Sequence, residues 1–256
     1  MTKKIFFVSD FHLGVEALLS STEREKKIIK WLSSIQTEIE ELYLVGDVFD
    51  HWFEYRRVIP KGYIRLFGKL AELRDMGIPI YFFTGNHDMW MFRYFEDELG
   101  IPIYREPITK TLYGKNFFIG HGDGLGHGDR GYKFIKKVFG SKVCQWGFGL
   151  LHPDTGLALM NYFSAKSRKY TGDDAPFIEP DREWLVEFCE NDIQFNDIDY
   201  YIFGHRHLPI DYTLSNGKSR YINLGEWMYA CSYGEWDGHE FKIKFFESDI
   251  NTIYGM

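Results

Sequence analysis

Residues 42–50 read Leu42-Tyr43-Leu44-Val45-Gly46-Asp47-Val48-Phe49-Asp50, an apolar run that leads directly into a glycine and two aspartates. The run is short and does not alternate, which is typical of a strand buried on both faces of a sheet. Four other runs have the same form. They are residues 5–8 before Ser9-Asp10-Phe11-His12, 80–83 before Thr84-Gly85-Asn86-His87-Asp88, 117–119 before Gly120-His121-Gly122-Asp123, and 200–203 before Gly204-His205-Arg206-His207.

Two amphipathic segments separate the first three of these strands. Residues 22–36 carry apolar side chains at helical spacing, and Thr22 with Glu25 predicts a capping box. Residues 62–76 form a second such segment, which Gly77 would close. The order strand, helix, strand, helix predicts an α/β fold with parallel pairing.

The end of the chain has a different pattern. Residues 220–224, 228–233 and 240–246 resemble successive strands, and glycine-containing turns occur at Asn216-Gly217 and Asp237-Gly238. This part of the sequence predicts a β-meander in the second half of the core.

Residues from about 125 to 180 interrupt the alternation of strands and helices. The segment is helical in pattern, rich in aromatic residues, and strongly basic between Leu125 and Tyr170, where eight cations face two anions. It predicts a helical lid insertion within a single domain that spans residues 1–256. The alternative is a solvated basic face whose rings pack onto the sheets.

The overall composition limits the functional classes. A formal charge of −7 argues against a general nucleic-acid binder. The three widely spaced cysteines fit reduced thiols in a cytoplasmic protein. Asp10 interrupts the first apolar run too early for a signal peptide or a spanning helix. Aromatic residues make up 18% of the chain, which fits either a phenylalanine-rich core or an exposed apolar surface.

The residues after the five strands are metal-ligand types. In open α/β sheets, ligands bind at the carboxyl edge, where these residues would meet. Two divalent cations about 4 Å apart neutralise phosphate oxygens and acidify the attacking water, and they need a shared carboxylate. Oxygen and imidazole donors without thiolate favour Mn²⁺, Fe or Mg²⁺, with Zn²⁺ as an alternative. A lone glycine-aspartate turn is usually a structural cap, but five such motifs in order predict a two-metal phosphoesterase.

The motifs DxH, GDxxD, GNHD, GHGD and GHxH, in that order, resemble the calcineurin-like metallophosphoesterase superfamily. The resemblance implies a four-layer α/β/β/α sandwich. It implies that one metal is held by Asp10, His12, Asp47 and His207, and the other by Asp47, Asn86, His121 and His205. It further implies that His87 acts on the scissile phosphate as electrophile or leaving-group acid, that Asp88 orients His87, and that Asp50 and Asp123 hold ligand imidazoles. Asn86, His87 and His205 would also contact substrate.

Within the superfamily, residues 9–14, 46–52 and 121–125 are most similar to the UDP-2,3-diacylglucosamine hydrolases of lipid A synthesis. Those enzymes are typically Mn²⁺-dependent pyrophosphatases that work peripherally at the cytoplasmic membrane face beneath a helical lid. The resemblance implies attack by water on the uridine-side phosphorus of a lipid-linked nucleotide sugar, giving UMP and 2,3-diacylglucosamine 1-phosphate. The lid residues that it suggests for substrate binding are Asp129, Tyr132, Ser164, Lys166, Ser167 and Arg168. One departure is that some members carry arginine where this chain has His87.

Several alternatives remain open from the sequence. The chain could hydrolyse a soluble phosphoester, such as a protein phosphate, a cyclic nucleotide or a dinucleoside polyphosphate, or it could be a non-catalytic metal-binding scaffold. Trp52, Phe53 and Tyr55 border an acyl groove or belong to the core. Surface positions are expected for most of the histidines outside the motifs, which are His51, His127, His152 and His239, although His127 is equally suited to touch substrate.

Overall fold

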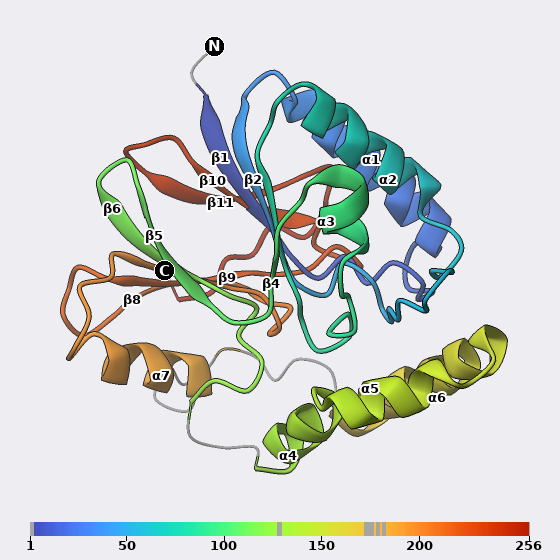
Figure 1. The fold of residues 1–256 in the computed structure, drawn as a ribbon. Helices are drawn as coiled ribbons and strands as arrows, with labels where there is room; N and C mark the ends of the chain where they lie inside the picture. Colours follow the sequence, from blue (N-terminus) through green and yellow to red (C-terminus); the bar gives the residue numbers. More distant parts are fainter. Residues whose placement is uncertain (1–2, 127–129, 172–176, 178–179, 181–182, 256) are drawn as a thin grey trace.

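Two sheets form the centre of the molecule (Figure 1). The computed structural model describes residues 3–126, 130–171, 177, 180 and 183–255. The first sheet has the order β11-β10-β1-β2-β3-β4 and the second the order β5-β6-β7-β9-β8. The bounds in the first sheet are β1 (Lys4–Val8), β2 (Ile39–Val45), β3 (Ile80–Phe83), β4 (Ile103–Tyr104), β10 (Ser232–Trp236) and β11 (Phe241–Phe245). Those in the second are β5 (Ile108–Leu112), β6 (Lys115–Ile119), β7 (Tyr200–Phe203), β8 (Pro209–Thr213) and β9 (Arg220–Leu224).

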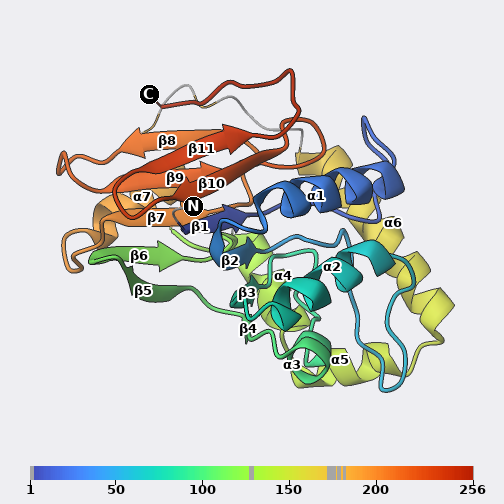
Figure 2. The same cartoon turned by 90° about the horizontal axis from the view of Figure 1, so that it is seen from above.

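Helices cover the outer face of each sheet, so that the core has four layers. Helices α1 (Ser21–Ile35), α2 (Ile64–Asp75) and α3 (Tyr94–Leu99) cover the first sheet, and α1 and α2 lie side by side (Figures 1 and 2). Helix α7 (Trp184–Asp192) covers the second sheet. The α/β/β/α sandwich expected from the sequence is confirmed.

Strand β1 illustrates why the apolar runs do not alternate. Ile5 and Phe7 pack between the two sheets, whereas Phe6 and Val8 pack against the helices. Successive side chains of a strand point to opposite faces, so a strand with a core on each side needs apolar residues throughout. The predicted parallel pairing is confirmed for β1, β2, β3 and β4, and for β6, β7 and β9.

The predicted β-meander is wrong. Strand β9 pairs with β7 and β8 in the second sheet, whereas β10 pairs with β1 and β11 in the first. Strand β10 also begins at Ser232, whereas the sequence predicted a strand from residue 228. The reason is a turn in which the buried Glu226 carboxylate accepts hydrogen bonds from the amides of Met228, Tyr229 and Ala230, which removes them from any ladder.

The capping box of α1 also differs from the prediction. Ser20, not Thr22, is the N-cap, and Glu23 completes the box. Glu25 is buried, and its Oε1 accepts from the backbone amides of Arg65 (2.9 Å) and Leu66 (3.0 Å) in the first turn of α2. Glu25 therefore joins two helices and does not cap its own.

Three helices occupy the predicted insertion, namely α4 (Arg130–Phe139), α5 (Lys142–Gly149) and α6 (Pro153–Thr171). They form a separate layer beside the sandwich (Figure 1). Trp90 joins this layer to the core, since its Nε1 donates to the Phe139 carbonyl at 2.8 Å and its ring lies 4.6 Å from that of Phe148. The division of the chain into one domain with a lid at about 125–180 stays a prediction.

Aromatic and aliphatic residues are found both in the core and on the lid surface. Rings fill the inter-sheet core, for example Phe7 against Tyr43 and Phe117. The lid helices expose large apolar side chains, including Phe134, Val143, Trp146, Leu150 and Tyr162. Among the described residues, no helix has the length and apolar character needed to cross a membrane.

Candidate metal centre

The polar residues that follow the buried strands lie in loops joined by backbone hydrogen bonds. The amide of Asp10 donates to the carbonyl of Gly46, and that of His12 to the carbonyl of Asp47. In the second sheet, Gly204 N donates to His121 O at 3.0 Å. The Asp10 Oδ2 atom accepts from the amide of His205 at 3.1 Å, which joins the loops of the two sheets. Residues from both sheets are therefore held at one edge.

Five of the seven proposed metal ligands have left-handed backbone conformations. The φ angles lie between 43° and 70° for Asp10, His12, Asp47, His205 and His207. This region is uncommon for residues other than glycine and costs conformational energy, which the surrounding hydrogen bonds must offset. Such strain gathers at functional sites, where it aims side chains that a regular strand or helix would direct elsewhere.

One group of donor atoms comprises Asp10, His12 and His207. The Asp10 Oδ1 atom lies 3.3 Å from His207 Nε2 and 3.6 Å from His12 Nε2. A second group comprises Asp47, His121 and His205, with Asp47 Oδ2 3.2 Å from His121 Nε2. The same Asp47 oxygen lies 3.8 Å from His12 Nε2, so this carboxylate faces both groups. The structure brings these predicted ligands into two neighbouring groups, and the assignment of the groups to two metals that share Asp47 stays a prediction.

Buried atoms without hydrogen bonds test whether these residues suit a metal. Asp10 Oδ1, Asn86 Oδ1 and His121 Nε2 are buried and make no hydrogen bond within the described part of the chain. A buried polar atom without a partner costs about 1–3 kcal/mol, so an unexplained group of them needs a ligand. Oxygen and imidazole donors that converge without thiolate suit divalent cations. The residues present therefore fit divalent metal binding.

Glycines keep the space around these donors open. A Cβ atom on Gly85 would lie 2.7 Å from His121 Nε2, and one on Gly204 would meet the Asp10 carboxylate. Any larger residue at either position would displace a proposed ligand. These glycines explain why the motifs need glycine directly before the ligand residues.

The tautomer of His121 follows from its hydrogen bond. His121 Nδ1 lies 2.9 Å from the Val45 carbonyl, which can only accept, so Nδ1 carries the proton. The Nε2 lone pair is then directed at Asp47 and is available to a metal. His12 is held similarly by Asp50, whose Oδ1 lies 3.4 Å from His12 Nδ1.

Burial and neighbouring charges shift the pKa values of the site residues strongly. Burial raises the pKa of Asp10, yet the nearby imidazoles of His12 and His207 hold it well below its usual range. Burial lowers the pKa of His121, but the charge of Asp47 outweighs this and raises it well above the ordinary value. Burial and the neighbouring His121 lower the pKa of His205 to about 4. Divalent cations would supply the charge that offsets the two aspartates.

His87 lies beside the first group, but its ring is held differently from the prediction. Its Nδ1 donates to the Asp50 carbonyl at 2.9 Å and lies 3.4 Å from the hydroxyl of Ser164 on α6. The Asp88 carboxylate instead accepts from the amides of Gly85 and Val48, at 2.7 and 2.9 Å. Among the described residues, Asp88 makes no hydrogen bond to the His87 ring. Asp88 therefore fixes the loops, and Asp50 with Ser164 orients His87.

The lid and the start of α7 are each joined to a metal-ligand loop by an ion pair. Lys136 on α4 pairs with Asp123 at 2.6 Å, two residues after His121. Glu183, just before α7, pairs at 2.8 Å with Arg206, which lies between His205 and His207. The predicted role of Asp123 in holding an imidazole stays a prediction.

Arg24 is a positioning residue that the sequence did not single out. It is fully buried, and its guanidinium donates to the carbonyls of Phe11, His12, Val15 and Leu19. The loop that carries His12 is thereby wrapped around one side chain. Arg24 lies in an amphipathic helix among other charged residues, so no local pattern distinguishes it from a solvated arginine.

The remaining predicted residues have mixed outcomes. Ser164 is buried and contacts Asp50 Oδ2 at 3.0 Å. The prediction of a surface position is wrong for His51, which packs beside Asp50 with 8% exposure. Trp52 is fully buried in the core, whereas Phe53 packs against the lid ring of Phe148. His127, Asp129 and the side chains of Tyr132, Lys166, Ser167 and Arg168 lie outside the described residues.

Comparison with known proteins agrees with this site. The model of the calcineurin-like phosphoesterase family matches residues 3–209. A UDP-2,3-diacylglucosamine hydrolase of Porphyromonas gingivalis is 37% identical over 254 residues, covering 93% of this chain and 95% of that protein. A protein of the same name from Hamiltonella defensa is 30% identical, covering 79% and 76% of the two chains. Another from Aeromonas salmonicida is 27% identical, covering 90% of each. The chain therefore belongs to the calcineurin-like phosphoesterase family.

Proposed function

We propose that this protein hydrolyses UDP-2,3-diacylglucosamine to UMP and 2,3-diacylglucosamine 1-phosphate, using two divalent cations, with Mn²⁺ as the preferred ion. The observation that carries the proposal is the match to a hydrolase of that name over 93% of the chain. So long a match must include most of the lid segment.

The site residues support hydrolysis at phosphorus. When bound, two cations neutralise the phosphate oxygens and acidify the attacking water. Asp10, His12, Asp47 and His207 would hold one cation, and Asp47, Asn86, His121 and His205 the other. The water adds to the uridine-side phosphorus, the bond to the bridging oxygen breaks, and the sugar 1-phosphate leaves with that oxygen. His87 already donates Nδ1–H to Asp50, so Nε2 is the nitrogen left for the leaving group.

The lid supports a lipid substrate. Its exposed apolar side chains, such as Phe134 and Trp146, share α4 and α5 with Lys133, Lys137 and Lys142. Exposed apolar surface beside cations suits acyl chains with an anionic diphosphate, and it suits peripheral contact with an anionic bilayer. The proposed location is therefore the cytoplasmic face of the membrane.

Turnover of the diacylated nucleotide sugar tests the proposal directly. We expect purified protein to release UMP in the presence of Mn²⁺ and to lose this activity with a chelator, because the aspartates alone repel the substrate. Chromatography of the products measures both effects. Failure to turn over this substrate with Mn²⁺, alongside rapid cleavage of soluble phosphoesters, would favour a phosphoesterase without a lipid substrate. No cleavage of either class, with no bound metal, would favour a scaffold.

Ser164 offers a test of the lid. We expect Ser164→Ala to lower kcat/KM on the diacylated substrate about tenfold, because one hydrogen bond to His87 or Asp50 is lost. Steady-state kinetics measure the effect. Asn161→Ala is the matched control, since Asn161 is an exposed polar residue on the same helix. Equal effects of the two substitutions would remove Ser164 from the proposed site.

A further inference from the structure

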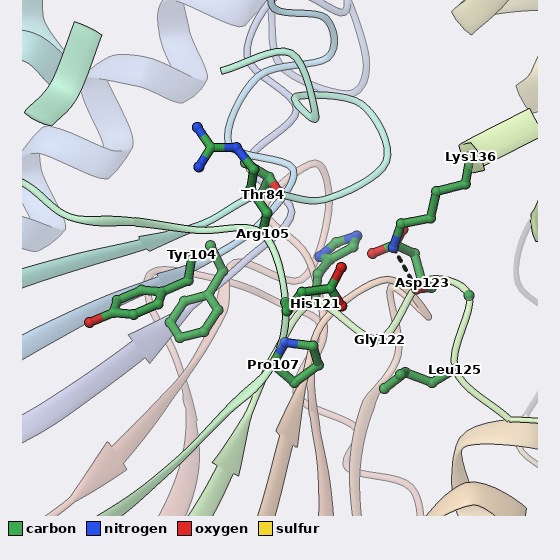
Figure 3. Close-up of a pocket in the computed structure, with 12 residues that line it drawn as sticks. Thr84, Tyr104, Arg105, Pro107, His121, Gly122, Asp123, Leu125 and Lys136 are labelled. Atoms are coloured by element: carbon green, nitrogen blue, oxygen red, sulfur yellow. Dashed lines mark hydrogen bonds and ion pairs between the residues drawn. The ribbon is translucent and has the colours of Figure 1, made fainter. Parts of the chain in front are cut away.

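A cavity of about 210 Å³ opens beside the metal centre, next to His121 (Figure 3). Its walls come from the residues after β3 and β4, which include Thr84 and Arg105, and from the loop after β6, which includes His121 and Asp123. Lys136 reaches toward Asp123 from α4 and closes one side (Figure 3). Thr84 and Arg105 have no role in the site described above or in the lid predictions.

The position of the cavity relative to the two donor groups determines the orientation in which a diphosphate substrate would bind. His121 forms part of the cavity wall and belongs to the group with Asp47 and His205. His87 lies with His12 and Asp47 in a further group, which shares His12 with the Asp10 and His207 group, and Ser164 of the lid lies 3.4 Å from its Nδ1. A diphosphate that spans both groups therefore extends one half of the substrate toward Ser164 and the other half toward the cavity.

The lining of the cavity decides which half it receives. Four charged side chains, Arg105, Glu106, Asp123 and Lys136, contribute to its walls. Two acyl chains need a broad apolar surface, and a group of exposed apolar side chains, among them Phe134, Val143 and Trp146, lies on α4 and α5. A small cavity with both charge signs is instead suited to a compact polar group.

A pyrimidine nucleoside has the required chemistry. Uracil presents one N–H donor between two carbonyl acceptors, and ribose adds hydroxyls. The cavity supplies a carboxylate acceptor at Glu106, the ion pair of Lys136 with Asp123, and the guanidinium of Arg105, whose Nη2 also donates to the carbonyls of Met91 and Phe92. The hydroxyl of Thr84 makes no hydrogen bond to any described residue, so it is available to a ligand. The ring of Tyr104 stacks on that of Phe83, with 5.1 Å between centroids, and gives one wall a flat aromatic base.

We propose that this cavity binds the uridine of the substrate while the lid receives the diacylated sugar. The inference rests on the proposed function for the identity of the nucleotide. It assigns substrate-recognition roles to Thr84, Arg105, Glu106 and Lys136, and it predicts that UMP, the product, remains bound in the cavity after the sugar phosphate has left.

Binding of UMP can be measured without any turnover. Isothermal titration of the Mn²⁺-loaded full-length protein with UMP, and separately with inorganic phosphate, is expected to show at least about tenfold tighter binding of UMP, because only UMP places a base in the cavity. Thr84→Phe, which fills the cavity, is expected to remove most of this preference. Thr109→Phe introduces the same ring at an exposed position of β5 and is expected to leave the preference for UMP over inorganic phosphate unchanged.

A second variant guards against misfolding of Thr84→Phe. Glu106 is exposed, and Glu106→Gln preserves the size of its side chain. We expect this variant to bind UMP several-fold more weakly and to bind inorganic phosphate as tightly as the wild-type protein does. Equal affinity of the wild-type protein for UMP and inorganic phosphate would overturn the inference, as would an unchanged UMP preference in both variants. Neither result depends on cleavage of the diacylated substrate, so the proposed function can fail in the turnover assay while UMP still binds in this cavity.

Discussion

Asp47→Asn is expected to lower kcat about a thousandfold and to reduce the bound metal below two equivalents. The substitution keeps the size of the side chain but removes the charge that faces both donor groups. The two cations supply several kcal/mol of stabilisation to the transition state, and each 1.4 kcal/mol changes a rate about tenfold. Turnover at saturating Mn²⁺ and metal analysis of the purified variant measure the two effects.

Asp75→Asn provides the control for this experiment. Asp75 is exposed at the end of α2 and lies outside the metal-ligand loops, so its substitution should leave both quantities unchanged. An Asp47→Asn protein that retained wild-type turnover and two metal equivalents would show that this carboxylate is not shared between cations.

Arg24→Met is expected to destabilise the fold by about 3 kcal/mol and to weaken metal binding about tenfold or more. The methionine fills part of the space but leaves four carbonyl groups without a donor, and each buried unsatisfied group costs about 1–3 kcal/mol unless water reaches it. Groups that hold a ligand loop from outside typically change metal affinity by about 10–100-fold. Urea unfolding of the apoprotein and Mn²⁺ titration give the two values.

Two comparisons separate positioning from general stability. Lys26→Met alters an exposed cation of the same helix and should affect neither measurement. Arg24→Lys retains the charge but can reach fewer carbonyls, so it should recover stability only in part. If Arg24→Met lost stability while its Mn²⁺ affinity stayed at the wild-type value, the role assigned to Arg24 in positioning His12 would be refuted.

The sequence predicted those parts of the fold that depend on local patterns. The five apolar runs became buried strands because each has a core on both faces, and this needs no knowledge of distant residues. The helix start was misplaced because Ser20 and Thr22 are each followed three residues later by a glutamate. Only the contact of Glu25 with the amides of Arg65 and Leu66, forty residues away in sequence, decides between the two capping boxes.

The pairing of the last strands was not predictable for a similar reason. Residues 220–246 contain three strand-like runs, and nothing in them shows that β10 returns to the edge of β1. The side chain of Glu226, which binds three successive amides, produces the turn between the sheets. Glu226 stands alone among apolar residues (Leu224-Gly225-Glu226-Trp227-Met228), and its residue type carries no signal of such a role.

At the site, the sequence predicted which residue types would meet but not how each is held. The motif order brought Asp10, Asp47 and His207 to one edge, as the parallel strands require. The left-handed backbone at these residues, and the contact of His87 with Ser164 of the lid, depend on tertiary structure. The assignment of individual ligands stays a prediction that metal-bound structures can test.

The most direct test is anomalous diffraction at the manganese edge from crystals grown with Mn²⁺. The account predicts two peaks about 4 Å apart on either side of the Asp47 carboxylate, one near Asp10, His12 and His207 and the other near Asn86, His121 and His205. A single peak, or peaks that do not contact Asp47, would contradict it.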